Sequence, residues 1–91
     1  KPGLVGGWAA AQEWIGLARE RGIGWWVTSA LESNVGLNAI AQWTATLQVD
    51  QAQGLGTGAV YVDNVTCPLE TSRGELYYRP EREWDLSRIL A

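Results

Sequence analysis

The sequence has no histidine and a single cysteine, Cys67, among its 91 residues. A lone cysteine excludes a disulfide within the chain, and the lack of histidine also excludes a zinc cluster built from this chain alone. Unpaired cysteine is typical of a reducing compartment, so we expect a cytoplasmic protein. No apolar run approaches the roughly 20 residues of a membrane-spanning helix and no signal sequence is visible, so we expect no membrane partner.

Positive charge is also scarce. Seven lysines and arginines against ten acidic residues give a formal net charge of -3, and the basic residues are scattered. A phosphate backbone needs a basic stripe, so we expect no nucleic-acid partner. The 46% of hydrophobic and 19% of charged residues indicate a folded chain of one domain at most. Six tryptophans carry large apolar faces, and we expect much of that surface to pack against segments outside this chain.

Two segments have the periodicity of amphipathic helices. The first is predicted over residues 8–21, and Gly22 stands where a left-handed C-terminal cap belongs. The second is predicted to begin at Ser33 or Asn34, either of which can cap a helix, and to end near Leu47. Their apolar faces consist of Ala11, Trp14, Ile15 and Ala18 in the first helix and Leu37, Ile40, Ala41, Thr44 and Leu47 in the second.

Two short apolar runs, residues 23–29 and 59–62, predict buried strands. The order helix, strand, helix, strand implies right-handed crossovers and therefore a parallel α/β sheet or barrel. Neighbouring strand residues point to opposite faces, so at most one of Trp25 and Trp26 can face a ligand, and we interpret both as core residues. The tail differs, because residues 72–75 predict a turn and residues 76–78 a short strand that Pro80 restricts to a sheet edge.

Ligands of α/β proteins meet the carboxyl ends of strands and the loops that follow. Lys1, residues 28–33 and the surroundings of the last strand are predicted to lie there. A lysine in that place can accept a proton when burial disfavours its charged form, although most lysines are solvated surface residues. Glu32 is either a functional carboxylate or a polar residue that the start of a helix favours.

The closely spaced glycines of residues 54–58 have two interpretations. Their backbone N–H groups could bind an anion, but the stretch precedes a strand instead of a helix, which is the wrong order for a nucleotide fingerprint. A tight turn is therefore the favoured interpretation. The triplet Asn64-Val65-Thr66 matches the glycosylation pattern, which is common by chance, and we do not interpret it as a site.

Taken together, several stretches resemble the C-terminal part of the o-succinylbenzoate synthases, a family of the enolase superfamily. They are residues 1–7 (Lys-Pro-Gly-Leu-Val-Gly-Gly), 27–37 (Val-Thr-Ser-Ala-Leu-Glu-Ser-Asn-Val-Gly-Leu), 54–58 (Gly-Leu-Gly-Thr-Gly), 63–64 (Asp-Asn) and 68–70 (Pro-Leu-Glu). The combination is far more specific than any single stretch, and the likeness extends to about Tyr78.

The resemblance implies an α/β fold, a modified (β/α)7β barrel with an α+β capping domain. Residues 1–70 would be the C-terminal portion of the barrel, from the end of the sixth strand through the eighth, with residues 59–62 as the eighth strand. Residues 71–91 would be a tail that packs toward the capping domain. We therefore expect a C-terminal portion of a larger protein, completed by its N-terminal part or by a complementary chain.

The reaction that the resemblance implies is a lyase reaction of menaquinone biosynthesis. It is the syn dehydration of 2-succinyl-6-hydroxy-2,4-cyclohexadiene-1-carboxylate to o-succinylbenzoate, with a divalent metal ion, normally Mg²⁺, held by acidic residues upstream of Lys1. This chain is thus expected to contribute no metal ligand and to be inactive alone. Lys1 is implied to be a catalytic residue whose positive charge stabilises the intermediate. By positional match, the candidates for binding the carboxylate substrate are Thr28, Ser29, Gly54, Gly56 and Thr57.

Two other functions stay open. One is another reaction of the superfamily, such as the racemisation of N-acylamino acids. Dipeptide epimerases usually carry an Asp-x-Asp signature near the eighth strand, and residues 54–58 lack it, which favours the synthase. The other is a non-catalytic α/β module that holds an anionic ligand with the glycine-rich stretch, and such a module would keep its ligand in the presence of a chelator.

Overall fold

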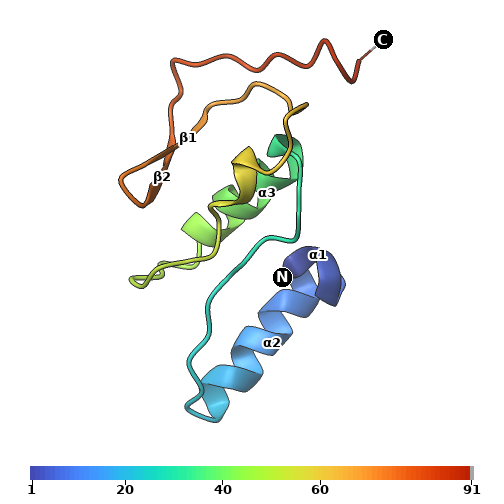
Figure 1. Cartoon of the computed structure of the whole chain (residues 1–91). Coiled ribbons are helices and arrows are strands. Elements are labelled where there is room, and N and C mark those ends of the chain that lie inside the picture. The colour runs from blue at the N-terminus through green and yellow to red at the C-terminus, as the bar shows by residue number, and fades with distance from the viewer. Residues whose placement is uncertain (91) are drawn as a thin grey trace.

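The computed structural model describes residues 1–90, and Figure 1 shows their arrangement. They form the helices α1 (Pro2–Val5), α2 (Trp8–Glu20) and α3 (Asn34–Ala45), the 3-10 turn η1 (Thr57–Ala59), and the strands β1 (Leu69–Ser72) and β2 (Glu75–Tyr78). Helix α3 lies between the α1–α2 pair and the hairpin of β1 and β2 (Figure 1). The described residues are therefore a small α/β unit.

Both predicted helices are present. Helix α2 is followed by Gly22 at φ +65°, the left-handed conformation expected at this cap. Helix α3 begins after Ser33, as predicted, and ends at Ala45, slightly before the predicted end. The sequence does not predict α1, which has Pro2 in its first turn, where a helix lacks a partner for the N–H anyway. None of the helices within residues 1–90 has the length and hydropathy of a membrane span.

The prediction of a regular strand at residues 23–29 is wrong. The segment is extended, runs back past α2 toward the start of α3 (Figure 1), and pairs through a parallel bridge of Thr28 with Gly54. The Gly54 N–H donates to the Val27 carbonyl at 2.8 Å, and the Ser29 N–H donates to the Gly54 carbonyl at 3.2 Å. The next ladder position is taken by the Gln53 side chain, whose Oε1 accepts the Val27 N–H at 2.7 Å. A side chain thus ends the pairing that a longer strand needs.

The prediction of a second buried strand at residues 59–62 is also wrong. Residues 57–59 form η1, and the side chains that follow are exposed, Val62 completely so. Gly54 takes the strand position instead, since it is the residue that pairs with Thr28. A short apolar run suits several environments, and only its partners decide among them.

Strands β1 and β2 form an antiparallel hairpin in which Leu69 pairs with Tyr78 and Ser72 with Glu75. The predicted turn and the predicted strand at residues 76–78 are confirmed, whereas β1 is not predicted from the sequence. Arg73 and Gly74 have φ values of +53° and +80°, the signs of a type I′ turn, which matches the twist of a hairpin. The hairpin crosses the predicted boundary between residues 70 and 71, and that division stays a prediction.

The core is small and lies against α3. It consists of Val27, Leu37, Ile40 and Leu55, with Trp25, Ala41, Trp43, Leu47, Leu69 and Leu76 packed around them.

The described residues are less compact than a typical domain. The radius of gyration is 14.2 Å, against about 12 Å for a compact domain of this length. The accessible surface of 6445 Å² likewise exceeds the about 5200 Å² typical of a monomer of this mass. Large apolar side chains on and near α2 therefore stay uncovered.

Candidate functional site

Lys1 meets the end of the extended segment. Its Nζ atom donates a hydrogen bond to the carbonyl oxygen of Ser29 at 2.8 Å, in a partly buried setting. Lys1 also lines an open hollow of about 430 Å³ together with Trp25, Trp26 and Thr28. An ammonium group has three hydrogens, so the bond to Ser29 leaves two of them for a ligand in this hollow.

Ser29 connects Lys1 to the glycine-rich stretch. The residue is 3% exposed, and its Oγ atom lies 2.5 Å from Oγ1 of Thr57. Its backbone N–H donates to the carbonyl of Gly54. One of the two hydroxyls donates to the other, which leaves the second hydrogen available for an acceptor such as a carboxylate.

Gly54 lies so close to Thr28 that a side chain has no room. A Cβ atom on Gly54 would be 2.5 Å from Cγ2 and 3.0 Å from Cβ of Thr28. The stretch does turn, since residues 57–59 form η1, but the glycines at positions 54, 56 and 58 all lack the positive φ that was expected of them. Gly54 instead permits two backbone segments to approach each other.

Gly56 lies apart from the other predicted binding residues. It is the residue before η1, and it lines a groove of about 660 Å³ between α3 and the hairpin. The hydroxyl of Thr57, one residue later, contacts Ser29 instead. The structure thus gathers Lys1 and every predicted binding residue except Gly56 around the end of the extended segment.

The two adjacent tryptophans differ in environment. Trp25 packs against the core and has the Arg19 guanidinium carbon 5.4 Å from its ring centroid. Trp26 is 63% exposed and lines the hollow beside Lys1, so the prediction of a core role is wrong for Trp26. Alternation of an extended chain places Trp26 on the same side as Thr28 and opposite the buried Val27. Trp25 lines the hollow as well as the core, so the expectation that at most one of the two can face a given site is wrong for this hollow.

Glu32 lies between α1 and α3. A Cβ atom on Gly36 would be 2.7 Å from Oε2 of Glu32, and one on Gly3 would be 3.0 Å from Oε1. The carboxylate therefore fills space that two glycines leave at the start of α3, where the helix dipole favours negative charge. Among the residues that the structure describes, no group of three or more His, Cys, Asp or Glu side chains could hold a metal ion.

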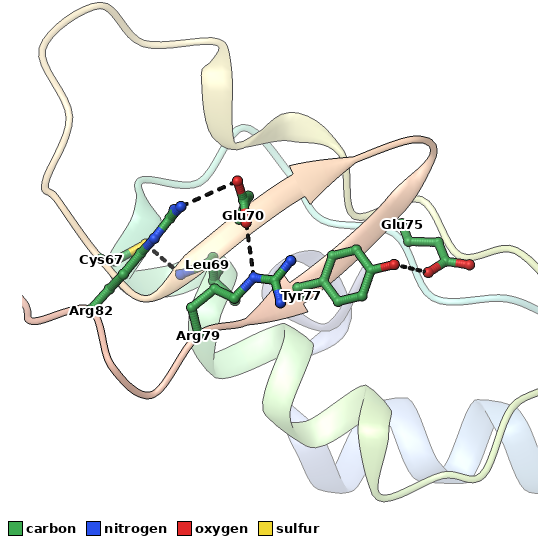
Figure 2. A network of polar contacts seen from close by, with 7 residues as sticks. All are labelled: Cys67, Leu69, Glu70, Glu75, Tyr77, Arg79 and Arg82. Atoms are coloured by element: carbon green, nitrogen blue, oxygen red, sulfur yellow. Dashed lines mark hydrogen bonds and ion pairs between the residues drawn. The ribbon is translucent and has the colours of Figure 1, made fainter.

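A separate polar cluster connects the tail to the hairpin, as Figure 2 shows. Arg79 Nε donates to Oε2 of Glu70 at 2.9 Å, and Arg82 Nη2 lies 3.2 Å from Oε1. The hydrogen bond from Arg79 and the charge of Arg82 hold the pKa of Glu70 below its usual value. A hydrogen bond to Glu75 raises the pKa of Tyr77. These contacts involve none of the predicted site residues.

Two asparagines that hold η1 against α3 have no role in the sequence-based hypothesis. Oδ1 of Asn64 accepts the Asn34 N–H at 2.9 Å, and Nδ2 of Asn34 donates to the Val65 carbonyl at 2.5 Å. Nδ2 of Asn64, the atom that glycosylation modifies, donates to the Gly58 carbonyl at 3.1 Å. Both asparagines fall in stretches that carry the family resemblance, which is the signal that could have singled them out.

The relationship of the chain to known proteins follows from two comparisons. The chain is 59% identical over 76 residues to a curated protein of Desulfotalea psychrophila. The aligned stretch covers 84% of this chain and 21% of that protein. The chain also superposes on a crystal structure from the same organism with a TM-score of 0.75 and 59% identity, covering 80% of this chain and 20% of the other. No protein-family model matches the chain.

These likenesses define the chain as a small α/β fragment related to a hydro-lyase. The curated relative is o-succinylbenzoate synthase, and the crystal structure is that of MenC from Desulfotalea psychrophila. The chain is therefore homologous to part of o-succinylbenzoate synthase, as the resemblance in the sequence predicts, and it spans about a fifth of the length of these relatives.

Proposed function

We propose that the complete protein containing this chain is an o-succinylbenzoate synthase of menaquinone biosynthesis. It dehydrates 2-succinyl-6-hydroxy-2,4-cyclohexadiene-1-carboxylate to o-succinylbenzoate, with loss of the proton beside the carboxylate and of the hydroxyl group as water. The observation that carries the proposal is the 59% identity over 76 residues to such a synthase. Since the chain corresponds to about a fifth of that enzyme, it is expected to be inactive alone.

The chain is placed as the C-terminal portion of the barrel, with residues 71–91 as a tail toward the capping domain. Two contacts support this placement, because they bring successive segment ends to one edge. Lys1 bonds to Ser29 at the end of the extended segment, and Thr28 bridges in parallel to Gly54. Segment ends on one edge are where barrel enzymes bind their substrates. The eighth strand then ends near Gly54, not at residues 59–62.

Lys1 is assigned the catalytic role within this chain. Removal of the proton beside the carboxylate places negative charge on the carboxylate oxygens, and a fixed ammonium group stabilises that charge. The bond to Ser29 fixes Nζ while leaving two hydrogens free. Nearby hydroxyl and backbone groups then bind the substrate carboxylates. The residues proposed to supply these groups are Thr28, Ser29, Gly54, Gly56 and Thr57, of which Gly56 lies apart from the others.

Relationship to this enzyme implies a metal ion, for which Mg²⁺ is proposed. As the resemblance implies, its ligands are proposed to lie in the rest of the complete protein. The partners proposed are that remaining part, within one chain or as a complementary chain, and the small carboxylate substrate. The protein is placed in the cytoplasm.

The test is to replace Lys1 in the complete protein and to follow the formation of o-succinylbenzoate with Mg²⁺ present. Lys1→Ala removes the charge that stabilises the intermediate, so kcat should fall by about 100- to 1000-fold or more. Lys1→Arg is the matched control, because it keeps the charge but changes its geometry, and it should retain more activity than Lys1→Ala. Turnover near the wild-type value in Lys1→Ala would contradict the assigned role.

A parallel assay with N-acylamino acids separates the synthase from the racemase alternative. The proposal expects efficient dehydration by the wild-type protein and much slower racemisation. Efficient racemisation without dehydration would reject the synthase while leaving the relationship to the superfamily intact.

A further inference from the structure

Helix α3 has an unusual N-terminal cap. Its N-cap residue, Ser33, makes no side-chain capping hydrogen bond to any residue of the described chain. The Asn34 N–H, one of the groups that a helix leaves unpaired at its start, is instead bound by Oδ1 of Asn64 at 2.9 Å. Asn64 lies 30 positions later in the chain, so the cap joins the helix to a distant loop.

The same amide side chain also holds η1. Nδ2 of Asn64 donates to the carbonyl of Gly58 within η1 at 3.1 Å, while Oδ1 accepts the N–H of Val65 at 2.8 Å. Asn34 returns the contact, since its Nδ2 donates to the Val65 carbonyl. Both ends of the Asn64 amide are therefore engaged, one by the helix and one by η1.

The fit between η1 and α3 is tight. A Cβ atom on Gly58 would lie 3.0 Å from Cδ2 of Leu37 and 3.1 Å from Oδ1 of Asn34. Val65, which follows Asn64, is buried. Because η1 starts at Thr57, whatever fixes η1 on the helix also fixes the hydroxyl that lies 2.5 Å from Oγ of Ser29.

We propose that Asn64 is a positioning residue that sets the Thr57–Ser29 hydroxyl pair for substrate binding. The inference rests on the proposed function, because it concerns the same substrate pocket. Asn64 does not contact the pair itself. It acts through η1, with Asn34 as its counterpart on α3, and the pair of asparagines forms a clasp between the helix and the loop.

Asn64→Asp in the complete protein distinguishes the role of the amide oxygen of Asn64 from that of its NH₂ group. An aspartate keeps the oxygen that caps α3, where negative charge suits the helix dipole, but it sets a second oxygen against the Gly58 carbonyl and loses the donor. The control is Asn38→Asp, the same substitution on α3, where the side chain of Asn38 accepts a hydrogen bond from the exposed side chain of Gln42.

Loss of one hydrogen bond should raise KM by about tenfold in Asn64→Asp and change kcat much less, with a melting temperature close to that of the control. Hydrogen–deuterium exchange followed by mass spectrometry should show faster exchange at residues 57–59 and unchanged exchange in α2. Equal KM and equal exchange in Asn64→Asp and Asn38→Asp would overturn the proposal.

A double variant tests the route through Thr57. If Asn64 acts by placing the Thr57 hydroxyl, then Asn64→Asp should not raise KM further in a Thr57→Val background. Fully additive effects would overturn the proposed route. If the complete wild-type protein proves unable to dehydrate the substrate, the proposed function fails, and the exchange at residues 57–59 alone decides whether the clasp holds η1.

Discussion

Helices α2 and α3 are nearly equal in length but differ in how much of their apolar face is covered. Helix α3 buries Leu37, Ile40 and Thr44, whereas α2 buries Ala11. Trp14 of α2 is 63% exposed and Leu17 is 44% exposed. Both apolar faces are evident in the sequence, so the difference shows that periodicity defines a helix while burial depends on what packs against it.

The α2 side of the molecule is connected to α3 by few contacts. The rings of Trp8 and Trp43 stack with their centroids 5.0 Å apart, and the Thr28–Gly54 bridge joins the extended segment to the stretch beside α3. By contrast, α3 packs against η1, Leu55 and the hairpin residues Leu69 and Leu76. The comparison therefore divides the chain into a well-packed α3 region and a sparsely covered α2 region.

The largest expected effect comes from truncating the centre of the α3 region. Leu37 is 1% exposed, so Leu37→Ala should lower the free energy of unfolding by about 2–5 kcal/mol. Leu17→Ala is the matched change on α2, and its cost should be smaller, about 1 kcal/mol or less, because much of the side chain is exposed. Urea unfolding of this chain alone measures both costs, and in the complete protein the cost at Leu17 should rise where other segments cover α2. Equal costs in this chain alone would contradict the difference between the two regions.

The next largest effect is expected where the two regions meet, at the pairing of Thr28 with Gly54. Gly54→Ala sets a methyl group 2.5 Å from Cγ2 of Thr28, which forces the segments apart and should cost about 1–3 kcal/mol, with a loss of dehydratase activity. Gly24→Ala is the control, since Gly24 belongs to the same extended segment as Thr28 and a Cβ there meets no atom within 4 Å among the described residues. Thermal melting and the activity assay, applied to both variants, test this. A Gly54→Ala protein as stable and active as Gly24→Ala would show that the close contact between Gly54 and Thr28 is not needed.

The smallest effect is expected from the ion pairs of the tail. Glu70→Gln should weaken the contact with Arg79 and Arg82 and speed hydrogen–deuterium exchange in residues 79–90 at neutral pH. The effect is modest because exposed ion pairs contribute little. The pKa of Glu70 is lowered in the folded chain, so its contribution is complete above the unfolded value of 4.5 and is lost as the pH falls through the folded value.

The same pH dependence supplies the check on Glu70. The difference in tail exchange between wild type and Glu70→Gln should disappear at low pH, where the carboxyl group of Glu70 is protonated. Glu81→Gln is the matched control, because Glu81 is an exposed carboxylate of the same tail, and it is not expected to alter tail exchange at any pH. A Glu70→Gln effect that grows in acid would contradict the assigned sign.

Helices α2 and α3 could be predicted from the sequence because their signals are local. The apolar spacing of both helices and the glycine at position 22 act within a few residues, whereas Ser33 marks the start of α3 without a side-chain capping hydrogen bond. The parallel pairing could not be predicted, because a strand depends on a partner that periodicity does not identify. Residues 59–62 have a strand composition but stay exposed, while Gly54 pairs with Thr28 despite its poor strand propensity.

The candidate site likewise combines features that the sequence predicts with features that it does not predict. The resemblance selected Lys1, Ser29 and Thr57, and the structure brings these three together. It could not show that Ser29 is the residue that contacts both of the others, or that Trp26 faces the hollow. The contact between the two asparagines leaves no local pattern either, because the residue that caps the helix lies 30 positions away, and only the family resemblance of their stretches could have pointed to them.

The spacing of these contacts along the chain also has a consequence for folding kinetics. Lys1 to Ser29, Ser29 to Thr57 and Asn34 to Asn64 each close a loop of 28 to 30 residues, whereas the helices and the hairpin close short ones. Loop closure must be completed before distant contacts stabilise the chain, so local elements form first. The contacts of the candidate site therefore carry a larger loop-closure cost than the helices and the hairpin, and they share this cost with the core that joins Val27, Leu37 and Leu55.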